Sequence, residues 1–339
     1  MTRTQTTEIF ATAPGRCGII GNPTDMYGGS VLSCTVQERA SCRLMPSDAL
    51  EIFNDDETAL LTKPEDFALR NDKLDIARAT LSFFHAEYGF DPAIARFALE
   101  LSTQIPMQAG MAGSTAMLAA IVGVIDKFLG LELTSYALAE TTRKIEARCL
   151  HIVCGLQDQH MAVFGGLNFM DFAGKEALEQ RDDEPFVTIE PLASLFPNPP
   201  LLLAHTGVEH HSGTVHRSPR ERWLAGDALV RSHYITIAAL ARRGKRALIE
   251  RDWRTLGALM NENHALVAEL GGSGPDNERL ILAARAAGAY GAKLAGAGGG
   301  GTIIALTDDP ARVGEALMAA GAERLLTPTP VPGLTVTQS

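Results

Sequence analysis

Residues 105–130, IPMQAGMAGSTAMLAAIVGVIDKFLG, constrain the fold more than any other part of the chain. A glycine-bearing loop leads here into an almost wholly apolar segment, which predicts a helix buried on most of its sides. The small residues at its start, among them Gly110, Gly113 and Ser114, expose successive backbone N–H groups. The helix dipole alone favours an anion bound there by about 0.3–2 kcal/mol. An ordinary N-cap at Gly113 or Ser114, without any ligand, is the simpler alternative.

Two further stretches are rich in glycine. Residues 15–29, GRCGIIGNPTDMYGG, hold five glycines. As a whole the stretch is too glycine-rich for a helix and too polar for a core strand. We therefore expect it to divide into a strand followed by a turn. Residues 291–301, GAKLAGAGGGG, contain the pattern G-x-G-x-x-G but run into the strand-like TIIAL. A dinucleotide-binding fingerprint would open a helix instead, so we predict a hairpin-like turn that serves either structure or close backbone approach to a ligand.

Two carboxylates complete the candidate chemistry. Glu146 lies at the end of a predicted helix over 134–150, and Asp158 lies twelve residues later in GLQDQ, which we expect to be a loop. One metal ligand and one general base are what phosphoryl transfer requires. For Glu146 a solvated helix face is the alternative. The pattern G-x-x-x-x-G-K-[ST] does not occur in the sequence, which excludes a Walker-type phosphate loop.

The chain has 339 residues, which predicts two domains because single cores seldom grow much larger than about 250 residues. Residues 173–200 are acidic and then rich in proline, so we place the boundary there, with domains at 1–192 and 193–339. Strands and helices alternate in both halves, which predicts an α+β or α/β class. Expected elements include paired strands over 31–44, a helix over 75–89 and long helices over 219–243 and 252–270.

The net charge and the cysteine pattern limit the classes of partner and the cellular compartment that we expect. The net charge is −10 and the sequence contains no basic run, which argues against nucleic acid and anionic membrane as partners. The five cysteines include no C-x-x-C pair, as expected of free thiols in a reducing compartment. The N-terminus lacks an apolar signal region, and no stretch approaches the roughly 18 apolar residues of a membrane span. We therefore expect a cytoplasmic protein.

The three glycine-rich stretches, in this order and spacing, resemble the motifs of the GHMP kinase superfamily, which comprises galactokinase, homoserine kinase, mevalonate kinase and phosphomevalonate kinase. The matching segments are APGRCGIIGNPTDMYGG, PMQAGMAGSTA and GAKLAGAGGGG. Within the superfamily, the GNPTD core is most similar to the glucuronokinase group. The resemblance implies an α+β fold with an N-terminal domain like domain 2 of ribosomal protein S5 and a C-terminal ferredoxin-like domain. It also implies transfer of the γ-phosphoryl group of ATP to a hydroxyl of a sugar or sugar acid.

The resemblance also implies residue roles. Asp158 would accept the hydroxyl proton, and Arg16 would orient Asp158 and offset negative charge. The residues implied to bind ATP are Pro106, Gly110, Met111, Ala112, Gly113, Ser114 and Thr115. Mg²⁺ would be held by Ser114 and Glu146. The residues implied to bind the acceptor are Asn22, Asp25, Tyr27, Gly296, Ala297 and Gly298.

The chain departs from the family pattern in ways that bear on the acceptor. Asn22 and Pro23 replace the Glu-His of the galactokinase-type motif, which argues against galactose. Ala295 stands where a serine or threonine is usual. A uronate carboxylate would require an arginine, and the candidates are Arg217, Arg220 and Arg222, which could equally begin a surface helix and pair with nearby acids.

Other functions remain open at this point. The acceptor could be another sugar or a mevalonate-type alcohol. A non-catalytic sensor on the same fold is an alternative of another class, although Arg16, Ser114, Glu146 and Asp158 are all present. A decarboxylase of the diphosphomevalonate type also shares the fold, but the GNPTD motif argues against it. In each case we expect a small-molecule ligand and a monomer or homodimer.

Overall fold

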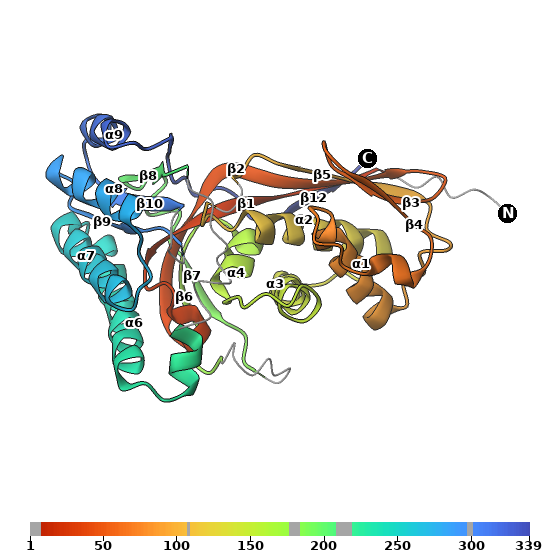
Figure 1. Cartoon of the computed structure of the whole chain (residues 1–339), viewed down its shortest axis with the longest axis horizontal. Coiled ribbons are helices and arrows are strands. Elements are labelled where there is room, and N and C mark those ends of the chain that lie inside the picture. The colour runs from red at the N-terminus through yellow and green to blue at the C-terminus, as the bar shows by residue number, and fades with distance from the viewer. Residues whose placement is uncertain (1–7, 107–108, 176–183, 208–218, 297–300) are drawn as a thin grey trace.

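The computed structural model describes residues 8–106, 109–175, 184–207, 219–296 and 301–339. A long curved sheet extends across the molecule, with helices packed beneath it, and a smaller sheet with its own helices forms one end (Figure 1). This arrangement confirms the predicted α+β class.

The first sheet contains eight strands: β1 (Ile9–Ile20), β2 (Ser30–Pro46), β3 (Leu50–Phe53), β4 (Thr58–Leu61), β5 (Phe97–Thr103), β6 (Leu167–Asp171), β7 (Thr188–Pro191) and β12 (Thr335–Gln338). Its order is β12-β1-β2-β5-β3-β4, with β6 paired to β2 and β7 paired to β6. Strand β2 is long enough to pair with β6 along its first residues and with β5 along its last. Residues 31–44, for which paired strands were expected, therefore lie in one continuous strand whose partners come from elsewhere in the chain.

Four helices cover one face of this sheet: α1 (Asp75–Tyr88), α2 (Gly113–Leu129), α3 (Ser135–Lys144) and α4 (Gln157–Phe164). Shorter helical turns occur at η1 (Thr24–Tyr27), η2 (Pro64–Phe67) and η3 (Ile145–Cys149), the last of them a π turn that continues α3. Helix α2 is the central one, since its residues from Thr115 to Ile125 are all buried. Its burial against β1 and β2 confirms what the apolar segment predicts.

The second sheet has the order β11-β8-β10-β9 with every pair antiparallel. Its strands are β8 (Leu201–His205), β9 (Gly291–Leu294), β10 (Thr302–Leu306) and β11 (Arg324–Leu326). Helices α6 (Ala228–Ile249), α7 (Trp253–Glu269) and α8 (Pro275–Ala286) separate β8 from β9, and α9 (Pro310–Ala319) separates β10 from β11. The first strand therefore lies beside the last, which is the ferredoxin-like arrangement.

Two local expectations are wrong. The helix expected over 219–243 is interrupted, because Gly226 adopts a positive φ of 81° and the Asp227 side chain then caps a new helix, α6, by accepting from the N–H groups of Leu229 and Val230. Residues 15–20 form the buried end of β1 and the helical turn η1 follows, which confirms the expected strand and turn, whereas the expectation that the stretch is too polar for a core strand is wrong for these residues. Glycines there allow other backbone segments to approach closely, as described below.

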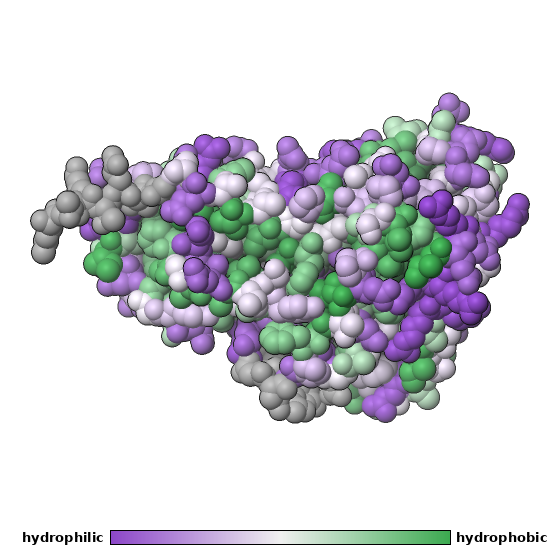
Figure 2. Space-filling model, turned by 180° about the vertical axis from the view of Figure 1, so that it is seen from behind, coloured by the Kyte–Doolittle hydropathy of each residue, from purple (hydrophilic) through white to green (hydrophobic). Residues whose placement is uncertain are grey.

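The chain returns to the first sheet at its end, where β12 pairs with β1 and places Gln338 opposite Ile9. The predicted domain boundary at 192/193 falls between β7 and β8 and stays a prediction. No helix in the described residues is long and apolar enough to cross a membrane. On the face opposite to that of Figure 1, hydrophobic residues form separate patches among hydrophilic ones (Figure 2).

Candidate active site

The three glycine-rich stretches come together at the ends of β1, α2 and β9. The N–H of Arg16 donates to the carbonyl of Met111 at 3.0 Å, and the N–H of Gly18 donates to the carbonyl of Ala295 at 2.8 Å. A Cβ atom added to Gly296 would lie only 2.5 Å from the carbonyl oxygen of Gly110. Glycine is therefore required at position 296 by close backbone approach, and segments far apart in sequence meet at one point.

Arg16 and Asp158 form a two-pronged ion pair at this junction. Nε of Arg16 donates to Oδ1 of Asp158 and Nη2 donates to Oδ2, both at 2.7 Å, while Nη1 donates to the carbonyl of Gly110 at 2.6 Å. Burial lowers the pKa of Arg16, but the Asp158 carboxylate outweighs burial and the net pKa is raised. The Asp158 side chain remains 30% exposed, so the carboxylate is both fixed in orientation and accessible.

Asp158 lies in the first turn of α4 and not in the loop that the sequence suggested. The helix begins there because the N–H groups of Leu156 and Gln157 donate to Oδ2 of Asp25, at 2.7 and 2.9 Å. A carboxylate at the start of a helix satisfies N–H groups that have no partner within the helix and interacts favourably with the dipole. Asp25 thus fixes the helix that carries Asp158, a link across 133 residues that no local pattern in the sequence reveals.

Glu146 lies in the π turn η3 and is buried. Its carboxylate accepts from Oγ1 of Thr115 at 3.1 Å and from Nε2 of Gln159 at 2.7 Å. Burial, and after it the negative charge of Asp158, raises the pKa of Glu146 to about 7 against the opposing effect of these donors. The solvated face considered as an alternative for Glu146 is therefore wrong.

The oxygen atoms around Glu146 show whether the site fits Mg²⁺. This ion prefers oxygen ligands and keeps several water or phosphate oxygens. A buried carboxylate beside a hydroxyl matches that preference. Ser114 is exposed in the first turn of α2, whereas the hydroxyl that contacts Glu146 belongs to Thr115. Among the described residues no cluster of three His, Cys, Asp or Glu side chains could hold a metal, so further ligands would come from phosphate or water.

The N-cap residue of α2 is Ala112, which precedes the helix, has a left-handed φ of 58° and provides no side-chain cap. The ordinary N-cap considered at Gly113 or Ser114 is therefore wrong. The preceding turn contains Gly110, with a φ of 74°, a conformation that glycine adopts without strain. Because Gly110 precedes α2 and its carbonyl accepts from Arg16, the first turn of α2 lies near the ion pair of Arg16 with Asp158. This turn supplies backbone N–H groups.

Asn22 and Lys293 connect the first and third stretches. Nδ2 of Asn22 donates to the carbonyl of Gly296 at 3.0 Å, and Nζ of Lys293 donates to Oδ1 of Asn22 at 2.8 Å and to the carbonyl of Gly18 at 3.4 Å. Lys293 is 1% exposed, and burial lowers its pKa to about 7. Sequence reasoning missed Lys293 and Gln159, because only their long-range partners distinguish them from other polar residues.

An aromatic cluster lies beside Asp25. The ring of Tyr27 has its centroid 4.6 Å from the Trp223 ring and 4.6 Å from the Tyr234 ring. Two other residues expected to bind the acceptor, Ala297 and Gly298, lie outside the described residues, as does Arg217.

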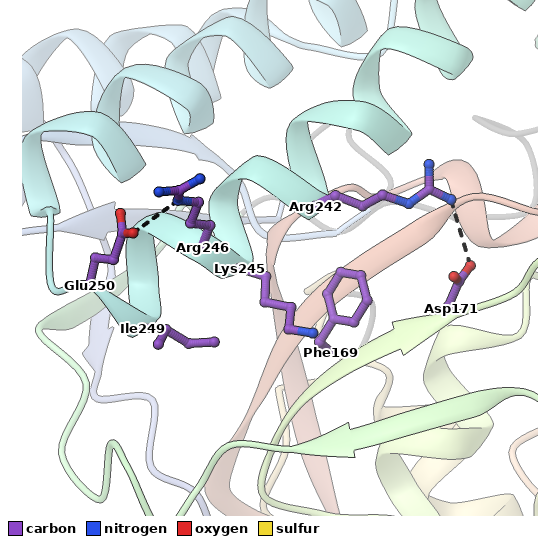
Figure 3. A pocket seen from close by; sticks show the side chains of 7 residues that line it. All are labelled: Phe169, Asp171, Arg242, Lys245, Arg246, Ile249 and Glu250. Carbon is purple, nitrogen blue, oxygen red and sulfur yellow. Dashed lines mark hydrogen bonds and ion pairs between the residues drawn. The ribbon is translucent and has the colours of Figure 1, made fainter.

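A cavity of about 500 Å³ lies elsewhere, between α6 and strand β6 (Figure 3). Its cations are already paired: Arg242 with Asp171 at 3.9 Å, Arg246 with Glu250 at 2.9 Å, and Lys245 with Glu190. None of the residues predicted for the site lines it. We therefore place the candidate active site at the junction of the three glycine-rich stretches.

Three family models match parts of the chain, and each match includes one of the three glycine-rich stretches. The family model described as GHMP kinases N terminal domain matches residues 75–166, and the model described as GHMP kinases C terminal matches residues 245–323. The galactokinase galactose-binding signature matches residues 2–42.

Curated relatives and solved structures cover almost the whole chain. Probable glucuronokinase 2 from Arabidopsis thaliana is 31% identical over 88% of this chain and 84% of the relative. Mevalonate kinase from Pyrococcus horikoshii is 28% identical over 97% of both chains. The crystal structure of Lactococcus lactis galactokinase complexed with galactose superposes with a TM-score of 0.78 at 17% identity, covering 98% of this chain and 95% of that one. This likeness confirms the two-domain fold that the sequence motifs imply.

Proposed function

The chain belongs to the GHMP kinase family of ATP-dependent phosphotransferases with an alcohol acceptor, and from this premise we propose that it phosphorylates a sugar or sugar acid. The favoured acceptor is D-glucuronate, which would become glucuronate 1-phosphate. Two glucuronokinases of Arabidopsis thaliana, 31% and 30% identical to this chain, support that choice, as does the GNPTD core. The observation that carries the proposal is the ion pair of Arg16 with Asp158 at the meeting point of the three motifs.

Asp158 acts as the general base. A neutral hydroxyl is a poor nucleophile, so its proton moves to the Asp158 carboxylate as the acceptor oxygen bonds to the γ-phosphorus. The bond from that phosphorus to the β–γ bridging oxygen breaks at the same time, and ADP leaves. Arg16 holds both carboxylate oxygens in place and brings a positive charge to the site. Base assistance of this kind contributes about 10²–10⁴ in rate.

The start of α2 binds the phosphates of ATP. Its backbone N–H groups and the helix dipole favour the negatively charged oxygens. The residues assigned to this role are Pro106, Gly110, Met111, Ala112, Gly113, Ser114 and Thr115. Ser114 and Glu146 would hold Mg²⁺, which, when bound, offsets the negative charge on the phosphate oxygens. Thr115 and Gln159 orient the Glu146 carboxylate toward that role.

The acceptor side is assigned to the first and third stretches, through Asn22, Asp25, Tyr27 and Gly296, with Ala297 and Gly298 retained from the family pattern. Asp25 uses Oδ2 to hold α4, and its Oδ1 has no hydrogen bond within the described part of the chain. That oxygen is suited to accept from a sugar hydroxyl. Asn22 acts by holding Gly296 in place, since both ends of its side-chain amide contact protein groups.

The proposal also includes the domain division, the compartment and the oligomeric state. We assign an N-terminal domain to 1–192 and a C-terminal domain to 193–339. The protein acts in the cytoplasm as a monomer or homodimer. Its three buried free thiols, Cys17, Cys34 and Cys42, are consistent with a reducing compartment.

The test is an ATP-consumption screen with D-glucuronate, D-galacturonate, galactose, arabinose, fucose and mevalonate as acceptors. Mevalonate is included because mevalonate kinases are among the relatives that match 97% of the chain. The proposal predicts that a uronate gives the highest kcat/KM. If no acceptor raises ADP release above background, the kinase function is wrong, and a binding protein without turnover becomes the better account. If a neutral sugar or mevalonate is preferred, the assignment to uronates is wrong.

A further inference from the structure

A short helical segment packs against the acceptor side of the site. Residues 219–224 are helical, and the ring of Trp223 lies 4.6 Å from that of Tyr27, two residues after Asp25. Arg231 at the start of α6 fixes this segment, since its guanidinium lies 5.6 Å from the Trp223 ring centroid and donates to the Trp223 carbonyl at 3.3 Å. The segment therefore lies next to Tyr27 and Asp25.

Arg220 is on the same face of this helical segment as Trp223, because residues three apart are neighbours on a helix surface. Its side chain is partly buried, and among the described residues it pairs with no carboxylate. Burial raises the pKa of the Tyr27 hydroxyl, and the positive charge of Arg220 opposes that rise, as expected for a guanidinium close to Tyr27. The negative charge of Asp25, by contrast, raises the pKa of the same hydroxyl. Within the described part of the chain, this partly buried cation thus has no carboxylate partner, and it lies close to Tyr27 on the acceptor side.

The neighbouring arginine, Arg222, has a structural role instead. Its Nε donates to Oδ2 of Asp227 at 2.7 Å, and Oδ1 of the same carboxylate caps α6. Moving Arg222 to a ligand would leave Asp227 without this partner. Of the three arginines that the sequence offers for an acidic acceptor, only Arg220 is therefore both described and uncommitted.

We infer that Arg220 binds the carboxylate of a sugar acid and so determines the specificity of this site for acidic over neutral acceptors. The inference rests on the proposed function and adds the residue that selects the substrate class. A guanidinium matches a carboxylate with two parallel hydrogen bonds, which a lysine cannot do. The partly exposed ring of Trp223, which is tilted against the Tyr27 ring, is placed to contact the sugar ring.

The chain offers a direct binding assay, because it contains only two tryptophans, Trp223 and Trp253. In a W253F background, emission comes from Trp223 alone. We expect D-glucuronate to change this emission in a saturable way, with D-glucose, which has a hydroxymethyl group in place of the carboxylate, binding about 100-fold more weakly. Adding R220M should weaken glucuronate binding about 100-fold and leave glucose binding unchanged. R220K keeps the positive charge but cannot form the two parallel hydrogen bonds, so it should weaken glucuronate binding by an intermediate factor of about tenfold.

Arg312, exposed on α9 at the far side of the second sheet, provides the matched control. R312Q removes one positive charge and should leave glucuronate binding within twofold. Kinetics give a second readout: R220M should raise the KM for glucuronate and leave the KM for ATP unchanged. Thermal unfolding checks that each variant is folded. If R220M is not folded, R220K replaces it in the binding and kinetic measurements.

The inference is overturned if R220M, or R220K in its place, binds glucuronate within threefold of the parent. It is equally overturned if the parent binds glucose as tightly as glucuronate. Turnover separates this result from the proposed function. Uronate phosphorylation that survives R220M refutes the role of Arg220 but keeps the kinase, whereas Arg220-dependent uronate binding without any ADP release refutes the kinase and keeps the role of Arg220.

Discussion

Replacing Gly296 with alanine tests whether the three motifs form one rigid site. The added Cβ would lie 2.5 Å from the Gly110 oxygen and 3.0 Å from its Cα, whereas ordinary contacts begin at 3.4 Å. The two backbones must therefore separate by about 0.9 Å, and neither is a flexible side chain that can turn away. Because the Gly110 carbonyl also accepts from Arg16, the displacement reaches the ion pair with Asp158.

A misplacement of about 1 Å in a catalytic constellation costs about 100-fold in rate, or about 2.7 kcal/mol of transition-state stabilisation. We therefore expect G296A to lower kcat/KM about 100-fold and to raise the KM for ATP, measured by ADP release at varied ATP and acceptor. G314A in α9 is the control, since its nearest neighbour is the end of the Leu325 side chain at 3.0 Å. A folded G296A enzyme with kcat/KM within threefold of wild type would refute this reasoning.

Two further predictions concern buried charged groups. In T115V, Glu146 loses its hydroxyl donor, so the Mg²⁺ concentration for half-maximal activity should rise about 10-fold or more in a metal titration. An unchanged Mg²⁺ requirement, like that expected of the T142V control in α3, would contradict the role of Thr115. The pKa of Lys293 is lowered to about 7 in the folded protein from 10.5. Between these values the unfolded chain binds more protons, so this lysine makes the free energy of unfolding rise with pH by up to about 1.4 kcal/mol per pH unit. The difference between wild type and K293M in urea unfolding should therefore grow in favour of wild type from pH 7 to pH 9, and a constant difference would show that the Lys293 amine does not titrate there.

The sequence predicted best those features that depend on local patterns. The apolar run at 113–129 defines α2 by itself, because a helix without a polar face has to be buried. The two strands expected before and after residues 297–300 are likewise confirmed, since Leu294 pairs with Ile303. In both cases neighbouring residues carry the signal.

The features that the sequence did not predict depend on distant partners. Asp158 starts a helix because Asp25, 133 residues earlier, accepts from the N–H groups just before it. Lys293 matters because its amine contacts Asn22 and Gly18 near the other end of the chain. The convergence of the three motifs was expected from family resemblance alone, since no property of the separate segments predicts that Gly110 and Gly296 touch.

The most direct test of the account is the variant D158N, which keeps the size of the side chain and removes the base. Arg16 and the start of α2 remain, so binding of a non-hydrolysable ATP analogue, measured by calorimetry, should stay within about threefold of wild type. The rate of phosphoryl transfer to the preferred acceptor should fall by about 10²–10⁴. A D158N enzyme that binds the nucleotide normally and turns over at a near wild-type rate would contradict the central claim that Asp158, held by Arg16, activates the acceptor hydroxyl.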